Sequence, residues 1–387
     1  MQRVRICAFF AAFMDAGLFF EMLNIDSTSG NEAGFADFLA TKFAGPGRKI
    51  SVFDVGDGTK NLLVSWGTPR VLFCTHLDTV PPYIPPTVGE RGISDIDVVS
   101  GRGTCDAKGQ IFSMYEACKE LEIRGHGDFG LLLLAGEETG SFGAKAFNKM
   151  ADESGETIFH DDAWVVVGEP TDNFMASAAK GTKSFEVTFT GKSCHSGYPE
   201  NGCSAVIYFN DFINALRSIV FPEDEVLGET TWNIGKLISD NPQNILSEKL
   251  TCRIYFRTTF ESDEMVCNVM KNIAGPDAKL RFGRRKVQDG SDIVAKDVAD
   301  WQKAMSVVAL GGDTPGRFEV LPEFEAKPVS FGSDAPQLKC FRHKILCGPG
   351  SILVAHKDEE YIKMADMEIA VSNYVRMYEL INERINR

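Results

Sequence analysis

Residues 131–143 read LLLLAGEETGSFG. Four consecutive leucines are typical of a strand buried on both faces, as in a parallel sheet between layers of helices. Two adjacent carboxylates, Glu137 and Glu138, follow this strand almost at once. Carboxylates at the end of a buried strand repel each other and lose hydration, which costs free energy. The stretch therefore predicts an α/β sheet and raises the question of what stabilises the two acids.

Strand-like and helix-like segments alternate on both sides of this stretch. VLFCTH at 71–76 is rich in β-forming apolar residues, and QIFSMYEACKEL at 110–121 has helical periodicity. A helix is expected from about 142 to 150, and WVVVGEP at 164–170 is a further strand. This alternation predicts an α/β domain with a largely parallel mixed sheet flanked by helices.

The pattern changes at about Ser177, where strands begin to alternate apolar and polar residues. Two such strands and two amphipathic helices are expected at 183–191, 250–260, 204–219 and 261–274. This order predicts a smaller α+β domain inserted into the first one. The expected division is 1–176 and 286–387 for the two parts of the catalytic domain, and 177–285 for the inserted domain.

The two ends of the chain predict helices. The first twenty residues resemble a signal peptide, with Arg3 and Arg5 before an apolar run. Asp15 interrupts that run and no small-residue cleavage site follows, so an amphipathic helix is the preferred interpretation. Ser-Gly-Asn-Glu at 29–32 has the pattern of a capping box that opens a helix to about Phe43. The last helix is expected from about Ala365 onward.

Composition excludes several classes of protein. The chain has 387 residues, of which 44% are hydrophobic, and no run of about twenty uncharged apolar residues that would predict a membrane span. Its net charge of −14, without a basic stripe, gives no support for nucleic-acid binding. Ten scattered cysteines without a CxxC pair are typical of reduced thiols, so a cytoplasmic protein is expected.

Potential ligands collect where the predicted strands end. Ligands of open parallel sheets lie beyond the carboxyl ends of the strands. The side chains expected at that edge are His76, Asp78, Asp106, Glu137, Glu138, Glu169 and His356. So many acids require positive charge nearby, and bound metal is the simplest source.

The ligand types suit zinc, with cobalt or manganese as alternatives, because imidazole and carboxylate are present without paired thiolates. Five ligands exceed the three that a catalytic zinc takes from protein, so two ions sharing one bridging carboxylate fit better. Each feature alone has an ordinary explanation. His76 could be a loop histidine, and Glu137 with Glu138 could open a solvated helix. Their expected convergence at one sheet edge favours the metal site.

Six motifs carry a family resemblance. They are THLDTVP, GRGTCDAKG, AGEETG, GEPT, CHSGYPENG and GPGS..VAHKDEEYI, in this order. Together they resemble the dizinc deacylases and exopeptidases of the acetylornithine deacetylase, succinyl-diaminopimelate desuccinylase, aminoacylase and carboxypeptidase group. The resemblance spans roughly residues 25–375.

This resemblance implies a role for each matching position in the metal centre. One zinc would be held by His76, Asp106 and Glu169, and the other by Asp106, Glu138 and His356. Asp78 would orient His76, and Glu137 would be the general base. The Asp106–Ala107 peptide bond is expected to be cis.

The resemblance also implies that the inserted domain is a dimerisation lid. His195 would then reach the active site of the partner subunit in a homodimer and polarise the scissile carbonyl. The substrate would be contacted by Lys180, Asn244, Arg257, Gly332 and Ser333. The chain departs from the family pattern here, because Tyr255 replaces the usual Asp and Lys180 stands where arginine is common.

The expected function is a metal-dependent amide hydrolase that removes an N-acyl group from an amino acid. The motif spacing is most similar to the acetylornithine deacetylase branch, which implies acetylornithine or acetylcitrulline in arginine biosynthesis. A succinyl-diaminopimelate desuccinylase and a small dipeptidase are alternatives within the family. A non-catalytic relative that binds metal or a small ligand is the alternative from a different class.

Overall fold

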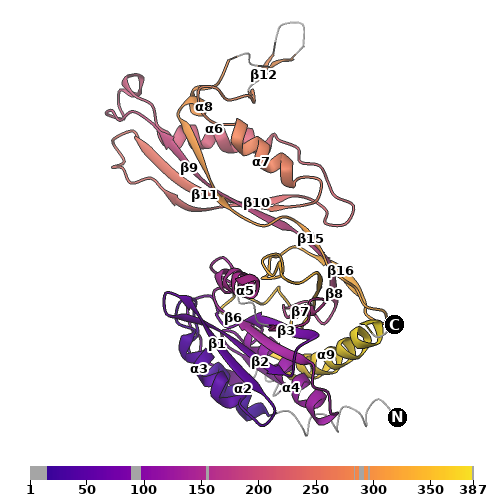
Figure 1. Cartoon of the computed structure of the whole chain (residues 1–387). Helices are drawn as coiled ribbons and strands as arrows, with labels where there is room; N and C mark the ends of the chain where they lie inside the picture. The colour runs from indigo at the N-terminus through magenta and orange to yellow at the C-terminus, as the bar shows by residue number, and fades with distance from the viewer. Residues whose placement is uncertain are drawn as a thin grey trace. The chain divides into compact units, whose positions relative to one another are not determined.

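A computed structural model describes residues 15–88, 97–153, 157–282, 284–286, 292–294 and 297–385 of the chain (Figure 1). Most of the apolar N-terminal stretch lies outside these residues, and the first helix described is α2 (Ala16–Leu23). The chain divides into two compact units. Unit 1 comprises residues 1–177, 318–327 and 333–387, and unit 2 comprises 178–317 and 328–332.

Unit 1 is built on a six-stranded mixed sheet. Its strand order is β1 (Lys49–Gly56), β2 (Thr59–Trp66), β6 (Phe129–Leu134), β3 (Val71–His76), β7 (Trp164–Val167) and β17 (His343–Leu346). The pairs β6–β3, β3–β7 and β7–β17 are parallel, and the two pairs that join β1, β2 and β6 are antiparallel. The predicted α/β class with a largely parallel mixed sheet is confirmed.

The tetraleucine strand is buried as predicted. Leu131 and Leu133 join the core that one face of the sheet shares with four helices, whereas Leu132 and Leu134 are buried outside that core. Those helices are α2, α3 (Ala33–Lys42), α4 (Lys108–Ile123) and α9 (Met364–Ile385). Helix α5 (Phe142–Glu153) contacts β1 and β2. Because β3 pairs in parallel with both β6 and β7, the carboxyl ends of these three strands lie at the same edge of the sheet (Figure 1).

Three further sheets of two or three short strands lie in the described part of the chain. One sheet joins β18 (Tyr361–Lys363), β5 (Val98–Ser100) and β4 (Thr87–Val88). Another joins β15 (Gly316–Arg317), β8 (Met175–Ala179) and β16 (Ala326–Val329). A third sheet pairs β12 (Arg284–Lys286) with β13 (Asp292–Val294) in antiparallel orientation.

The predicted capping box at 29–32 is wrong. Helix α3 begins at Ala33, and its N-cap residue Glu32 makes no side-chain capping bond. The hydroxyl of Ser29 instead donates to Asp78, and the Glu32 carboxylate accepts the N–H of Gly30. A buried carboxylate competes for the serine, so the local pattern does not form its usual cap.

Unit 2 is an antiparallel sheet with helices on one face. The strand order is β10 (Thr231–Ile238), β11 (Lys249–Thr258), β9 (Gly181–Thr190) and β14 (Met305–Gly311). Helices α6 (Ala205–Arg217) and α7 (Asp263–Asn272) share its core, which includes Trp301 of the short helix α8 (Asp300–Lys303). A 3-10 turn, η1 (Pro199–Asn201), precedes α6.

The second unit extends further than predicted. Its boundary was expected at 285, but the unit continues to Arg317 because β14 pairs with β9 as an edge strand of its sheet. No helix in the described ranges is long and apolar enough to cross a membrane.

Candidate metal centre

The expected ligands of unit 1 follow the strands of its sheet or lie in loops beside them. His76 is the last residue of β3, and Glu169 follows β7 after one intervening residue. Glu138 comes four residues after the end of β6. Asp106 lies in the loop before α4, and His356 lies in the loop between β17 and β18. Segments distant in sequence thus supply one cluster.

The structure brings the five predicted metal ligands together. Ligand atoms of His76, Asp106 and Glu169 lie within 4.8 Å of one another, and so do those of Asp106, Glu138 and His356. Asp106 belongs to both groups. Its Oδ1 lies 2.9 Å from Nε2 of His76, and its Oδ2 lies 3.3 Å from Nε2 of His356. One oxygen toward each imidazole is the geometry that a bridging carboxylate requires.

Asp78 organises the neighbouring backbone. Its carboxylate accepts the N–H of Glu137 at 3.0 Å and the N–H of Glu138 at 3.2 Å. Nδ1 of His76 is 2.9 Å from the carbonyl oxygen of Asp78 and 3.5 Å from its carboxylate. The carbonyl is therefore the nearer partner, and it leaves Nε2 of His76 available as a ligand.

The electrostatics of the cluster favour added positive charge. Burial raises the pKa of the Glu169 carboxyl well above its ordinary value, and Asp106 adds to this increase. Burial by itself would lower the pKa of His76, but hydrogen bonds to Asp106 and Asp78 raise that pKa well above its ordinary value. Hydrogen bonds to Asp106 and Glu138 raise the pKa of His356 to about 10. The cluster therefore stabilises cations.

Glu137 lies beside the predicted ligands, and its carboxyl is strongly desolvated. Desolvation raises the pKa of its carboxyl well above the ordinary value; His76 partly offsets this effect, and Asp334 and Glu138 increase it. Ligand atoms of Glu137 lie within 4.8 Å of those of His76 and Glu138. Adjacent residues at the end of β6 thus occupy different positions in one cluster.

The Asp106–Ala107 peptide bond is cis, as the resemblance implied. Sequence reasoning missed contacts to Asp78 and to the loop that carries this bond. Ser29 donates to Asp78, and a buried pair, Arg102 and Glu360, contacts the loop that carries Asp106. Arg102 and Glu360 stand inside the GRGTCDAKG and HKDEEYI motifs, which is the only signal that could have drawn attention to them.

Unit 2 brings His195 and Asn244 close to each other. His195 forms an isolated bridge with Ile245, and the N–H of Ser196 donates to the carbonyl of Asn244 at 2.9 Å. The His195 side chain is exposed, and its Nδ1 accepts the N–H of Gly197 at 3.0 Å. This bond leaves the proton of a neutral ring on Nε2, where it can donate to a ligand.

Unit 2 also groups three of the predicted substrate contacts. The guanidinium of Arg257 lies over the Tyr255 ring, 5.0 Å from its centre. A Cβ at Gly332 would be 3.7 Å from Nη1 of Arg257. Burial lowers the pKa of Lys180; the charge of Glu229 partly offsets this effect, and the charge of Arg257 adds to it. Nζ of Lys180 donates to the carbonyl of Glu229. Ser333 belongs to unit 1, where its Oγ accepts the N–H of Ala335.

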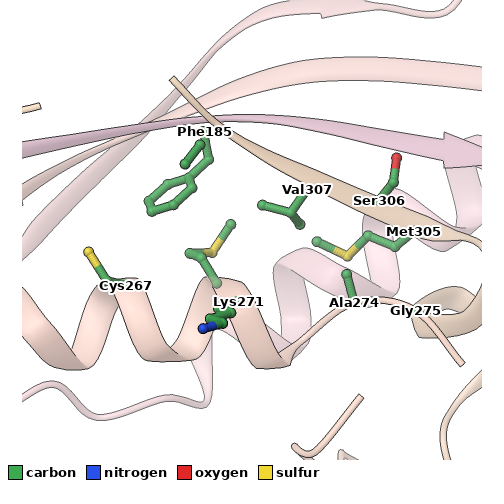
Figure 2. A pocket seen from close by; sticks show the side chains of 10 residues that line it. Phe185, Cys267, Lys271, Ala274, Gly275, Met305, Ser306 and Val307 are labelled. Carbon is green, nitrogen blue, oxygen red and sulfur yellow. The ribbon is translucent and has the colours of Figure 1, made fainter. Parts of the chain in front are cut away.

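A groove of about 520 Å³ in unit 2 lacks this chemistry. It lies between α7 and β14, and its lining includes Phe185, Ala274 and Val307 (Figure 2). Among the described residues that line it, Lys271 is the one with a charge, and none is a histidine, aspartate or glutamate. The groove is therefore mostly apolar, unlike the ligand cluster, which consists of acids and histidines.

Comparison with known proteins agrees with a metal-dependent hydrolase. Residues 72–380 match the profile of "Peptidase family M20/M25/M40", so the chain belongs to this family. A protein named probable carboxypeptidase from Emericella nidulans is 31% identical, with 94% of this chain and 89% of the relative covered. The chain is an enzyme, a hydrolase of the metallopeptidase class.

Solved structures share the fold at low sequence identity. A tripeptidase from Staphylococcus aureus has a TM-score of 0.70 and 19% identity, covering 94% of this chain and 96% of its own. A Bacillus subtilis protein described as a dinuclear metal binding peptidase has a TM-score of 0.61 and 10% identity, covering 96% and 99%. These likenesses support the α/β fold with its second unit.

Proposed function

We propose that this protein uses two divalent metal ions to hydrolyse the amide bond of a small substrate whose amino-acid part carries a free carboxylate. The substrate class includes short peptides and N-acyl amino acids. The observation that carries the proposal is Asp106, which directs one carboxylate oxygen toward each of two histidines inside a cluster of acids.

The donor set fits the metals. His76, Asp106 and Glu169 would hold one ion, and Asp106, Glu138 and His356 the other. Nitrogen and oxygen ligands without thiolates suit zinc, and also cobalt or manganese. Bound ions would lower the pKa of water and polarise the substrate carbonyl. They would also supply the positive charge that the buried carboxylates require.

Glu137 performs the proton transfers in this proposal. Its carboxylate takes a proton from water as the water oxygen forms a bond to the carbonyl carbon. It then delivers that proton to the amide nitrogen as the carbon–nitrogen bond breaks. The position of Glu137 supports both steps, because its carboxylate lies within 4.8 Å of ligand atoms of His76 and Glu138, beside the proposed metal centre.

Unit 2 supplies substrate contacts. In a homodimer, His195 of one subunit would donate its Nε2 proton to the carbonyl oxygen in the partner's site. Arg257 would bind the substrate carboxylate, with Lys180 adding positive charge and Asn244 contributing its amide. Tyr255 supports the role of Arg257, because an aromatic ring leaves the guanidinium donors available where a carboxylate would occupy them.

The likeness to proteins named carboxypeptidase supports a peptide or acyl chain on the amino side of the scissile bond. Acetylornithine and acetylcitrulline belong to the same substrate class, and so does succinyl-diaminopimelate. All of them combine an amide with a free α-carboxylate. The substrate test therefore separates members of one class.

The test is a hydrolysis screen with zinc or cobalt present. It compares the three acyl amino acids named above with an N-acetylated dipeptide, its C-terminal amide and the same dipeptide with a free amino group. We expect the substrates with a free α-carboxylate to be cleaved fastest. The C-terminal amide should react about 10–100-fold more slowly, because a charged hydrogen bond to Arg257 is lost.

Two results would contradict the proposal. Equal cleavage of the free acid and its C-terminal amide would reject carboxylate recognition. Cleavage that persists after complete metal removal, verified by elemental analysis, would reject the metal centre. Cleavage of the unblocked dipeptide alone would restrict the substrates to short peptides and exclude N-acyl amino acids.

A further inference from the structure

The loops that carry Asp106 and His356 meet at one short sheet. Strand β5 leads into the loop of Asp106, and the loop of His356 leads into β18. These strands pair in antiparallel register, with Ser100 opposite Tyr361. Whereas His76 ends a strand of the central sheet, Asp106 and His356 lie in loops. Their spacing therefore depends on contacts between the two loops.

Glu360 forms one half of such a contact. Its carboxylate is fully buried, and Oε1 accepts the N–H of Cys105 at 3.0 Å and the N–H of Asp106 at 3.1 Å. The N–H of Gly101 donates to the Glu360 carbonyl at 2.9 Å. A residue from the second loop thus holds the backbone of the first loop at the predicted bridging ligand.

Arg102 forms the other half. Its Nη1 donates to Oε2 of Glu360 at 2.7 Å and to the carbonyl of Lys357 at 3.0 Å. Lys357 is the residue directly after His356. Nε of Arg102 also donates to the carbonyl of Pro82 at 3.3 Å. Each member of the pair therefore comes from one loop and holds the backbone beside the ligand of the other.

A buried ion pair is a weak source of stability, because the loss of hydration offsets most of the attraction between its charges. What the pair does provide is a set of backbone contacts that join the two loops. We propose that Arg102 and Glu360 are positioning residues that set the spacing between the Asp106 and His356 ligands. They would thereby set the affinity for the second metal ion, the one that Asp106, Glu138 and His356 would hold. This inference rests on the proposed metal centre.

The test measures metal affinity rather than turnover. Wild-type protein and variants are loaded with zinc, and each ion is removed by titration with a chelator. In Glu360→Ala and Arg102→Met, we expect the ion held by Asp106, Glu138 and His356 to be released at about 10–100-fold lower chelator concentration than in the wild type. The ion held by His76, Asp106 and Glu169 should show a smaller change. Glu360→Gln keeps an acceptor oxygen for both amides, so it should recover part of the lost affinity.

A second ion pair provides the matched control. Arg48 and Glu122 are also paired in unit 1, at side chains that belong to neither ligand group. Glu122→Gln should change the unfolding midpoint but not the affinity for either ion. If Glu360→Ala does not fold, Glu360→Gln and Arg102→Lys carry the same comparison.

The outcomes separate the inference from the proposed function. Wild-type protein that binds no second ion would overturn the metal centre and this inference together. Wild-type protein that binds two ions, with unchanged affinity in the Arg102 and Glu360 variants, would overturn this inference alone. Equal losses of affinity in the Glu122 control would also overturn it, because the effect would then follow stability.

Discussion

Glu137 and Glu138 are adjacent but occupy different surroundings. Glu138 shares a ligand group with Asp106 and His356, and Glu137 does not. Their backbone N–H groups both donate to Asp78, which fixes the direction in which each side chain leaves the strand. The proposed roles of ligand and base follow from this difference.

Glu137→Gln tests the base. The amide is similar in size and cannot accept the proton, so turnover should fall about 10²–10⁴-fold while both metal ions remain bound. The measurement combines steady-state kinetics with elemental analysis of the purified variant. Full activity in Glu137→Gln would remove this residue from the mechanism.

Asp106→Ala tests the shared ligand. Both predicted ion sites lose an oxygen at once, so the metal content should fall from about two ions per chain to less than one. Glu169→Ala is the comparison, because Glu169 belongs to only one of the two predicted zinc sites. An unchanged metal content in Asp106→Ala would exclude a bridging role.

The sequence predicts a strand most clearly where every residue of that strand is buried. VLFCTH and LLLL became β3 and part of β6, because long apolar runs have few alternatives to a buried strand. The ligands at their ends followed from the rule on parallel sheets.

Contacts between distant segments were not predictable. Arg102 and Glu360 are 258 positions apart, and no local pattern connects them. Strand β14 follows a polar stretch, and its place beside β9 depends on pairing that the sequence does not display. Ser29 fits a capping box locally, yet a buried carboxylate takes its hydroxyl.

Close packing at the start of α5 gives a prediction for that element. A Cβ at Gly143 would meet the carbonyl oxygen of Ala135 at 2.3 Å and Oδ1 of Asn61 at 2.6 Å. Gly143→Ala should therefore destabilise the protein by about 1–3 kcal/mol. Gly34→Ala in α3 is the control, since nothing lies within 4 Å and it should stabilise by about 0.5–1 kcal/mol.

Chemical denaturation of both variants, followed by circular dichroism, checks this pair. The two changes add the same methyl group inside a helix, so helix propensity favours both. Only the space around the new atom differs. Similar stabilities for the two variants would show that the start of α5 can move away from Ala135 and Asn61.

In the whole molecule, the predicted metal ligands and most of the predicted substrate contacts lie in different units. The ligand cluster belongs to unit 1, and His195, Asn244 and Arg257 belong to unit 2. The exposed ring of His195 has its Nδ1 occupied by the N–H of Gly197, so its free donor is Nε2. A donor of this kind can serve a substrate held by another subunit, which a homodimer would provide.

Hybrid dimers test this arrangement. A subunit with His195→Ala keeps its base, and a subunit with Glu137→Gln keeps its histidine. If the histidine acts in the partner's site, a hybrid contains one intact site, and it should show about half the wild-type activity although each parent dimer is inactive. Co-expression with two affinity tags and purification on both isolates the hybrid. A hybrid between Glu137→Gln and a subunit with both changes is the control, and it should stay inactive. Activity restricted to parent His195→Ala dimers, or purified hybrids without activity, would show that the histidine does not act across subunits.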